Sequence, residues 1–418
     1  VNDASPNAFG YPTPGLSRQE RRRFLVGNSF FKQNWIESPA SATERDGLGP
    51  LFNARSCSAC HLRDGRSAPP EAEDRSRHGL LIRIGQRIDG ERDALHPIYG
   101  GQIQDVGVLG TKAEANVRID YERVDGEFGD RTGFELLKPQ YSLKEAAYGD
   151  PGPAAVLGPR TAPALIGLGL LEAVPLSTLK DLSDPTDRDA DGISGRVHYL
   201  DDRRRVAGRF GWKATQPTVR DQVAAAFVND MGITSQLFPQ EVVTEVQRST
   251  ISVHAGAPEI REETFEKVVF YTAALAVPAQ RNAEAAAVVR GQQLFEAMGC
   301  ASCHRPTLTT GAAAFHPKYA HQKIHPYTDL LLHDMGPGLM DEKHDGDAAP
   351  AEWRTPALWG IGLVETVSGH TRFLHDGRAR NLSEAVLWHG GEAEASRERY
   401  RLANPKDRAA LLAFLQSL

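Results

Sequence analysis

The same five-residue pattern, Cys-x-x-Cys-His, occurs twice in this chain of 418 residues. The spacing places two thiols one helical turn apart, so that both can form thioethers with one porphyrin while the histidine binds its iron. A thioredoxin-like redox pair does not require the histidine, and a four-cysteine zinc site would leave both histidines unexplained. All four cysteines of the chain lie in the two copies, which are Cys57-Ser-Ala-Cys60-His61 and Cys300-Ala-Ser-Cys303-His304. The motifs predict two covalently bound haem c groups with His61 and His304 as iron ligands.

A second chemical pattern is the acidic run Asp187-Arg-Asp189-Ala-Asp191-Gly192. Alternating carboxylates around a glycine turn can wrap a calcium ion. The hand-type calcium loop also requires glutamate at its twelfth position, where this chain has His198. The match is partial, so a calcium site and a solvated acidic turn both remain open.

The segments around the two Cys-x-x-Cys-His motifs are predicted to be helical. Ser17-Arg-Gln-Glu20 is a capping-box pattern that predicts a helix through about Trp35. Apolar residues at helical spacing predict another helix over 259–276. Residues 283–298 lead as a strong helix directly into the second motif, which is the order found in a cytochrome c domain.

Short runs of β-forming residues interrupt this helical pattern after the first motif. Leu80-Leu-Ile-Arg-Ile and Val117-Arg-Ile-Asp-Tyr lie between glycine-rich turns and predict a small β element. We therefore predict a mostly α protein of two cytochrome c-like haem domains. The first spans residues 1–282 and carries a long insertion, at about 62–280, with minor β structure; the second spans residues 283–418.

Composition limits the classes of function. A net charge of −6 gives no footprint for nucleic-acid binding. The most apolar stretch, Ala162 to Leu176, is broken by Gly, Pro and Glu172, so no membrane span is predicted. The chain opens with Val1-Asn-Asp-Ala, which we interpret as a mature product whose export signal was removed or left out. Because haem is attached to Cys-x-x-Cys-His on the outer side of the bacterial inner membrane, the predicted location is the periplasm.

Several further stretches resemble the bacterial dihaem cytochrome c peroxidase superfamily, and most closely its branch of dihaem, or thiol, oxidoreductases. They cover nearly the whole chain and include Leu51-Phe-Asn-Ala-Arg-Ser-Cys57, Ile166-Gly-Leu-Gly-Leu-Leu-Glu172, Gly208-Arg-Phe-Gly-Trp212-Lys, Asp230-Met231-Gly-Ile-Thr-Ser, Arg354-Thr-Pro-Ala-Leu-Trp-Gly, Phe373-Leu-His375-Asp-Gly-Arg and Leu387-Trp-His389-Gly-Gly. No residue in them demonstrates thiol chemistry.

The resemblance implies a second iron ligand for the C-terminal haem. In the peroxidases a methionine binds this iron, and His389 falls on its position, 14 residues after His375. Ligation by His304 and His389 together is then expected to lower the reduction potential, because methionine raises it. The plain alternative is that His389 is an ordinary surface residue of a helix.

The resemblance also implies residues around the N-terminal haem. Trp212 matches the tryptophan that lies between the two haems and is a candidate electron relay. Asp230 arrives two residues earlier than the peroxidase acid and replaces glutamate, so Glu172 is a rival for the catalytic acid. The sixth position of this iron is open, or is taken by His78 or Met231.

The resemblance further implies that His333 and His375 hydrogen-bond haem propionates or loop carbonyls, and that Arg354 pairs with a propionate.

Two functions of different class follow from these predictions. In the first, the protein is a peroxidase-like enzyme: one haem binds a small-molecule oxidant, and the bis-histidine haem supplies electrons from a small periplasmic cytochrome or cupredoxin. In the second, both irons are six-coordinate and the protein only transfers electrons. The spin state of the N-terminal haem distinguishes the two.

Overall fold

The computed structural model describes residues 1–70, 79–88, 90, 92–203, 205–251, 258–312 and 314–418. It is 31% helical and 18% strand, so the predicted mostly α class is wrong. The helices are short, and strand structure in the insertion is far more extensive than the sequence runs predicted. The main reason is residues 116–144, where β-branched and aromatic residues alternate with charged ones and pair along their whole length.

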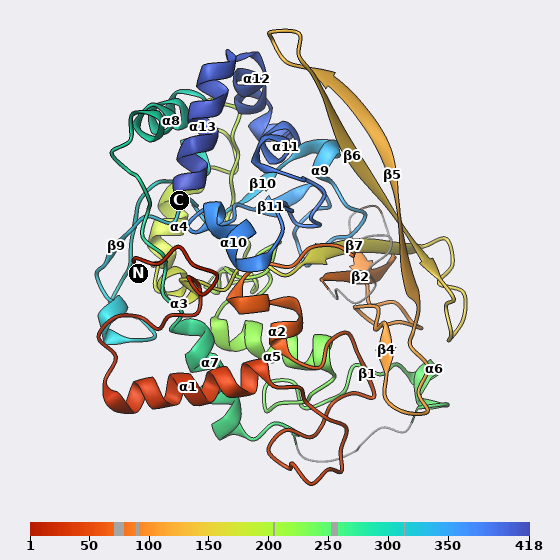
Figure 1. Cartoon of the computed structure of the whole chain (residues 1–418). Helices are drawn as coiled ribbons and strands as arrows, with labels where there is room; N and C mark the ends of the chain where they lie inside the picture. The colour runs from red at the N-terminus through yellow and green to blue at the C-terminus, as the bar shows by residue number, and fades with distance from the viewer. Residues whose placement is uncertain (71–78, 89, 91, 204, 252–257, 313) are drawn as a thin grey trace.

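One group of helices lies together around the first motif, in the lower half of Figure 1. Its members are α1 (Arg18–Lys32), α2 (Cys57–Cys60), α5 (Val219–Met231) and α7 (Glu262–Ala273). The predicted capping box is confirmed: the Ser17 hydroxyl accepts from the Glu20 N–H at 3.2 Å, and the Glu20 carboxylate accepts from the Ser17 N–H at 2.7 Å. Helices α1 and α7 can approach closely because Gly27 has no side chain. A Cβ at this position would lie 2.1 Å from the Lys267 carbonyl oxygen.

A second group of helices lies around the second motif, in the upper half of Figure 1. Helix α8 (Ala286–Ala297) crosses α13 (Pro405–Ser417) at Gly291, where a Cβ would lie 2.0 Å from the Ala410 carbonyl oxygen. The other members are α9 (Gly336–Leu339), α10 (Val364–Ser368), α11 (Leu382–Leu387) and α12 (Glu394–Leu402).

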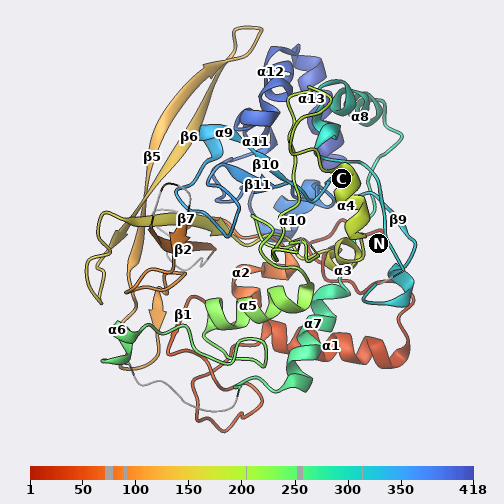
Figure 2. The same ribbon diagram turned by 180° about the vertical axis from the view of Figure 1, so that it is seen from behind.

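A long antiparallel hairpin connects these two regions. It consists of β5 (Asn116–Glu127) and β6 (Gly133–Lys144), and it runs along one side of the molecule in both Figure 1 and Figure 2. Near its tip, the Gly129 N–H donates to the Arg401 carbonyl at 2.9 Å, and Arg408 pairs with Asp130 at 2.8 Å. The hairpin therefore fastens the insertion to the C-terminal helices.

The remaining strands form small antiparallel sheets. Strand β2 (Leu80–Arg87) pairs with β3 (Asp93–Ala94) and β7 (Ala155–Thr161). The two-stranded pairs are β1 (Leu51–Phe52) with β4 (Val106–Gly107), β8 (Leu308–Thr309) with β9 (Lys323–Ile324), and β10 (Leu332–Asp334) with β11 (Glu352–Arg354). Short helices complete the chain: α3 (Leu168–Glu172), α4 (Leu176–Leu182) and α6 (Glu245–Arg248).

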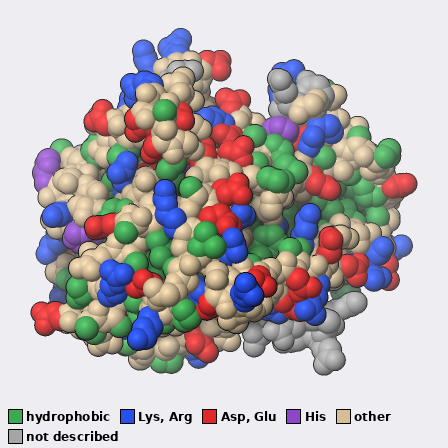
Figure 3. All heavy atoms as spheres, turned by 90° about the horizontal axis from the view of Figure 1, so that it is seen from above, with side chains coloured by type: hydrophobic (Ala, Val, Ile, Leu, Met, Phe, Trp, Pro, Cys, Tyr) green, Lys and Arg blue, Asp and Glu red, His purple; other side chains and the backbone are tan. Residues whose placement is uncertain are grey.

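Each helical group encloses its own apolar core. One cluster joins α1, α5 and α7 with the loops near the first motif, and the other joins α8, α11 and α13 near the second. The predicted boundary at residue 282 falls between α7 and α8, and the division into two domains stays a prediction. On the face drawn in Figure 3, acidic and basic side chains are interspersed.

Candidate haem-binding sites

The first motif begins as the short helix α2, which two backbone contacts hold in place. The N–H groups of Asn53 and Ala54 donate to the Asp230 carbonyl at 2.8 and 3.0 Å. The N–H of Trp35 donates to the Arg55 carbonyl at 2.7 Å. The loop before the motif is thus pinned between the end of α1 and the C-terminal end of α5.

The histidine of the first motif interacts with two backbone groups, those of Gly65 and Pro163. His61 Nδ1 lies 3.3 Å from the Gly65 carbonyl oxygen. Burial lowers the pKa of His61 to about 4, which favours the neutral imidazole that an iron ligand must be. The side chain keeps partial access to solvent although protein surrounds it closely, as expected for a residue lining an internal space.

The second motif follows α8 through a tight turn at Gly299, whose φ is 86°. His304 Nδ1 lies 2.9 Å from the Tyr327 carbonyl oxygen. Burial lowers the pKa of His304 to about 4. A backbone carbonyl on Nδ1 is the arrangement that orients a metal-binding imidazole and leaves Nε2 for the metal.

His389 shares this arrangement from a different element. It follows α11, and its Nδ1 lies 2.7 Å from the Ala385 carbonyl oxygen. Burial also lowers the pKa of His389, and His389 is close enough to lower that of His304 electrostatically. Among the described residues, no hydrogen bond reaches Nε2 of either ring. Two neutral imidazoles near each other, each with Nε2 free, fit the axial positions of one haem.

Buried polar atoms without a protein partner give a second test of fit. Three of these atoms near the motifs are His375 Nε2, Arg66 Nε and Trp388 Nε1. Leaving a buried donor unpaired costs free energy. Haem propionates would supply carboxylate acceptors for donors of this kind. The residues present therefore fit a haem at each motif.

Comparison with known proteins decides the family. A family model described as "di-haem oxidoreductase, putative peroxidase" matches residues 2–418. The chain belongs to this di-haem oxidoreductase family. Haem is therefore its cofactor class and oxidoreduction its class of chemistry.

Other comparisons add little to this assignment. No curated protein sequence matches the chain. A hydrazine synthase of Kuenenia stuttgartiensis is similar at 14% identity and a TM-score of 0.38, over 98% of this chain and 96% of that one. A similarity of this degree supports no conclusion about function. In the described part of the chain, every helix is too short or too polar to cross a bilayer.

Trp212 of this di-haem oxidoreductase lies between segments that follow the two motifs. Its Nε1 donates to the Thr161 carbonyl at 2.7 Å. Its ring lies edge-on to His375, with centroids 6.5 Å apart, and the Arg66 guanidinium is 5.6 Å from its centre. His375 in turn stacks on Trp353 at 3.7 Å. The position is compatible with the predicted relay role.

The two candidate acids differ in their surroundings. Burial and the nearby Asp230 raise the pKa of both Cys57 and Cys60, which places this carboxylate beside the first motif. Burial also raises the pKa of Asp230 itself, and Gln102 Nε2 donates to it at 2.9 Å. Glu172 instead accepts from the Val219 N–H at 2.5 Å, at the start of α5. Burial raises the pKa of Glu172 as well, so the choice of acid stays a prediction.

The sixth ligand of the first iron stays a prediction. Met231 is 3% exposed and packs in the apolar cluster of the first helical group. His78 lies outside the described residues.

The predicted propionate contacts also stay predictions. Arg354 is buried, and its side chain donates to the carbonyls of Gly211 and Thr355, both at 3.0 Å. Burial lowers its pKa to about 10, as expected for a cation that lacks a close carboxylate. His375 is buried; its Nε2 lies 3.7 Å from an Asp376 carboxylate oxygen and makes no hydrogen bond.

The acidic run forms a compact, exposed turn. One carboxylate oxygen from each of Asp187, Asp189 and Asp191 lies within 4.8 Å of the others. The Gly192 N–H donates to Asp187 at 3.2 Å, which a solvated turn would also show. Calcium therefore stays a prediction.

Two further buried polar groups lie in hydrogen-bond networks of their own: His333, which the resemblance implied as a haem contact, and Glu114, which sequence reasoning did not identify. At the second motif, His333 Nε2 lies 2.9 Å from Asp329 and Nδ1 lies 2.6 Å from Glu392. Burial opposes the charged form of His333, but the bonds to these carboxylates outweigh it and raise its pKa to about 12. Its Nδ1 is 3.5 Å from Cys303 Sγ. Asp329 is only four residues from His333, but Glu392 is 59 residues away and meets His333 only in the folded chain.

The other group lies beside the first motif. Glu114 accepts from the Gln104 N–H at 2.5 Å and from the Gln247 amide, and it is 1% exposed. Gln104 and Gln102 both donate to the Asn229 carbonyl, at 2.6 and 3.0 Å. The network thus links Glu114 with the neighbourhood of Asp230.

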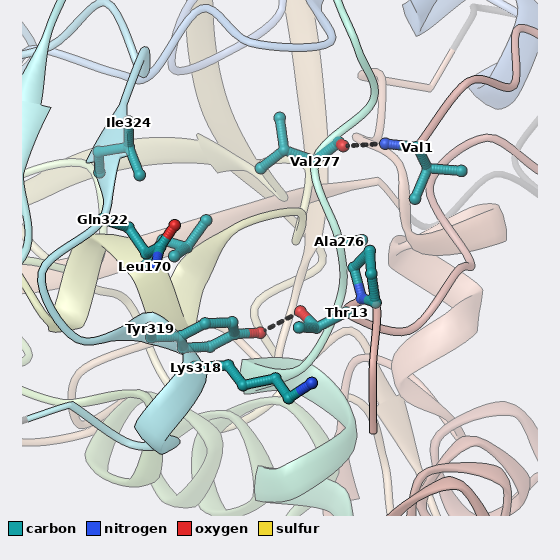
Figure 4. Close-up of a pocket in the computed structure, with 10 residues that line it drawn as sticks. Val1, Thr13, Leu170, Ala276, Val277, Lys318, Tyr319, Gln322 and Ile324 are labelled. Carbon is teal, nitrogen blue, oxygen red and sulfur yellow. Dashed lines mark hydrogen bonds between the residues drawn. The ribbon is translucent and has the colours of Figure 1, made fainter. Parts of the chain in front are cut away.

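A surface cleft of about 540 Å³ lies apart from these residues. Figure 4 shows it between the N-terminal arm and the loop around Tyr319, whose hydroxyl bonds to Thr13. Its walls include Leu170, Val277 and Ile324, and its lining contains none of the predicted site residues.

Proposed function

We propose that this di-haem oxidoreductase is an exported, peroxidase-like cytochrome with two covalently attached haem c groups. The N-terminal haem is the catalytic one, and the C-terminal haem stores and transfers electrons. A small-molecule oxidant such as peroxide is the substrate class, and a small cytochrome or cupredoxin in the periplasm is the electron donor. The attachment residues are Cys57, Cys60, Cys300 and Cys303, with His61 and His304 as axial ligands.

The observation that best supports this proposal is the pair formed by His304 and His389. The two rings come from elements far apart in sequence and are close enough to interact electrostatically. Each is held through Nδ1 by a backbone carbonyl, so each presents Nε2. If a haem is bound here, His304 and His389 would both hold its iron, and the group would then supply electron transfer rather than substrate binding.

Asp230 is the proposed catalytic acid of the N-terminal haem. A haem iron with an open position supplies the redox chemistry for binding and reducing a small oxidant. Asp230 can hold and deliver the proton that O–O cleavage requires, because burial favours its protonated form. Trp212, between segments of both motifs, is the proposed electron relay.

The second candidate function is electron transfer without a substrate. Met231 is the observation that favours it, because it adjoins Asp230 at the end of α5 and offers a buried thioether. If this sulfur bound the first iron, both haems would be six-coordinate.

Two measurements on the purified protein test the proposal. Intact mass after denaturation should show two haems retained covalently; a mass without haem would overturn attachment. Electron paramagnetic resonance should then show one low-spin haem and one high-spin haem that binds cyanide in the as-isolated or half-reduced protein. Two low-spin haems that ignore cyanide in both states would replace the enzyme by the electron-transfer protein.

A further inference from the structure

Arg66 is a partly buried cation to which the proposed function assigns no role. It lies five residues after His61, and its backbone is tied to the C-terminal part of the chain. Its N–H donates to the Ser368 hydroxyl at 3.2 Å, and its carbonyl lies 2.9 Å from His370 Nε2. The residue therefore stands where the segment after the first motif meets the region around the second.

The guanidinium of Arg66 is incompletely paired. Nη2 donates to the Leu374 carbonyl at 2.6 Å, but the buried Nε has no partner. No carboxylate among the described residues lies within ion-pair distance of it. Burial lowers the pKa of Arg66 to about 10, so the protein around it does not compensate its charge.

The nearest acid is already committed to other donors. Asp376 accepts from Arg378 Nε at 2.8 Å and from the Tyr141 hydroxyl at 3.0 Å. Its oxygens therefore satisfy Arg378, and Asp376 reaches Arg66 only through a longer electrostatic interaction. Among the described residues, no second carboxylate is left to pair with Arg66.

The aromatic neighbours narrow the place of this anion. The guanidinium carbon is 5.6 Å from the ring centre of Trp212 and 5.7 Å from that of Phe373. The attraction of a cation to aromatic faces is too weak to replace a carboxylate partner. The Arg66 guanidinium, with its unpaired Nε, therefore lies next to Trp212, between the segments that follow the two motifs. We call this place the junction of the two sites.

We propose that Arg66 binds the carboxylate of a haem propionate at this junction and so positions the haem against Trp212. This inference rests on the proposed attachment of two haems. A guanidinium hydrogen-bonded to a carboxylate is a short, charge-assisted contact, and its positive charge favours the ferrous over the ferric haem. Arg66 is thus a positioning residue that also raises the reduction potential of the haem it holds.

The test compares three variants in the intact protein by redox titration. Arg66→Gln keeps length and polarity but removes the charge, and should reduce the equilibrium constant for reduction of one haem about tenfold, or about 59 mV for one electron. Arg66→Lys keeps the charge and should restore most of the potential. Arg63→Gln, three residues earlier and exposed, is the matched control and should change neither potential.

Intact mass is measured first, so that loss of haem attachment is recognised separately. The inference is wrong if both haems are attached in Arg66→Gln and the equilibrium constant for reduction of each haem stays within twofold of the wild-type value. If Arg66→Gln does not fold, a crystal structure of the wild-type holoprotein tests the inference by the distance between the guanidinium and the propionates. A propionate oxygen within 3.2 Å of the guanidinium supports the inference, and both propionate pairs beyond 4 Å overturn it.

Discussion

At the scale of single residues, burial determines which form of each histidine is present. His61 and His304 sit among protein atoms that lower their pKa to about 4, so they are neutral at physiological pH. His333 is equally enclosed, yet two carboxylates keep it charged. Neutral rings can bind iron, whereas the charged ring can only donate hydrogen bonds.

Replacing His389 by methionine tests the proposed second ligand of the C-terminal iron. A thioether favours the ferrous state more than imidazole does, so His389→Met should raise one reduction potential by on the order of 100 mV. The change is measured by spectroscopic redox titration. The exposed His325 gives the control variant His325→Met, and an unchanged titration in His389→Met would exclude His389 as a ligand.

Replacing Asp230 by asparagine tests the proposed acid. The amide keeps the shape but carries no transferable proton, so peroxide turnover should fall by about 10²-fold or more while both haems remain attached. Glu172 lies at the end of α3 and accepts a hydrogen bond from the first residue of α5. The Glu172→Gln variant should keep turnover within a few-fold of the wild-type value. Equal losses in the two variants would contradict the assignment.

Glu114 predicts a pH dependence of stability. Burial raises its pKa from 4.5 to about 8, so the folded protein holds a proton that the unfolded chain releases between these values. The free energy of unfolding contributed by Glu114 should therefore fall as pH rises from 4.5 to 8, by up to a few kcal/mol. Chemical unfolding at several pH values should show this slope, and Glu114→Gln should flatten it. The exposed Glu365 gives the control Glu365→Gln, and identical slopes in wild type and Glu114→Gln would refute the prediction.

At the scale of elements, each helical group contains a close helix crossing that requires a glycine. Gly27 lets α1 meet α7, and Gly291 lets α8 meet α13, in both cases against a backbone carbonyl that cannot rotate away. Since α1 leads toward the first motif and α8 runs directly into the second, these crossings set where the cysteines lie.

Substituting Gly291 by alanine measures how much the close packing of α8 against α13 contributes to stability. Alanine alone would stabilise a helix by about 1 kcal/mol. A Cβ 2.0 Å from the Ala410 carbonyl must instead push the helices apart, at about 1–3 kcal/mol or more. We expect a net loss in the urea midpoint. Gly133→Ala, where the nearest atom is 3.9 Å away, should be within about 0.5 kcal/mol of wild type; a stabilised Gly291→Ala would show that the contact is loose.

At the scale of the whole molecule, the predicted insertion contacts the regions around both Cys-x-x-Cys-His motifs. The β5–β6 hairpin contacts helix α13 through Asp130, and it contacts the loop before α11 through Tyr141, which donates to Asp376. Trp212 and Lys213 also belong to the insertion, and the buried Lys213 ammonium binds Asp341 at 3.2 Å and the Ala349 carbonyl at 2.7 Å. The two sites thus share walls, although each motif has its own helices.

Removing one attachment site tests how independent the two sites are. The Cys57→Ala, Cys60→Ala double variant should retain one haem by intact mass, because α8, α11 and α13 form their own core around the second motif. The matched Cys300→Ala, Cys303→Ala variant should retain the other. Loss of both haems from either variant would show that the sites fold as one unit.

The part of this protein that sequence alone determined is local. The two Cys-x-x-Cys-His motifs, the capping box at Ser17 and the helix entering the second motif depend on residues a few positions apart, so spacing suffices to recognise them. The small β element was also expected, but its length was not, because strand pairing depends on a partner strand more than on propensity.

Tertiary structure decided what depends on residues far apart in the chain. Asp230 and Glu172 look alike in sequence, and only folding puts one beside the cysteines and the other at the start of a helix. The unpaired nitrogen of Arg66 and the approach of Glu392 to His333 are likewise invisible until distant segments meet. Burial and electrostatic pairing are properties of the packed molecule, because they depend on every atom nearby rather than on order along the chain.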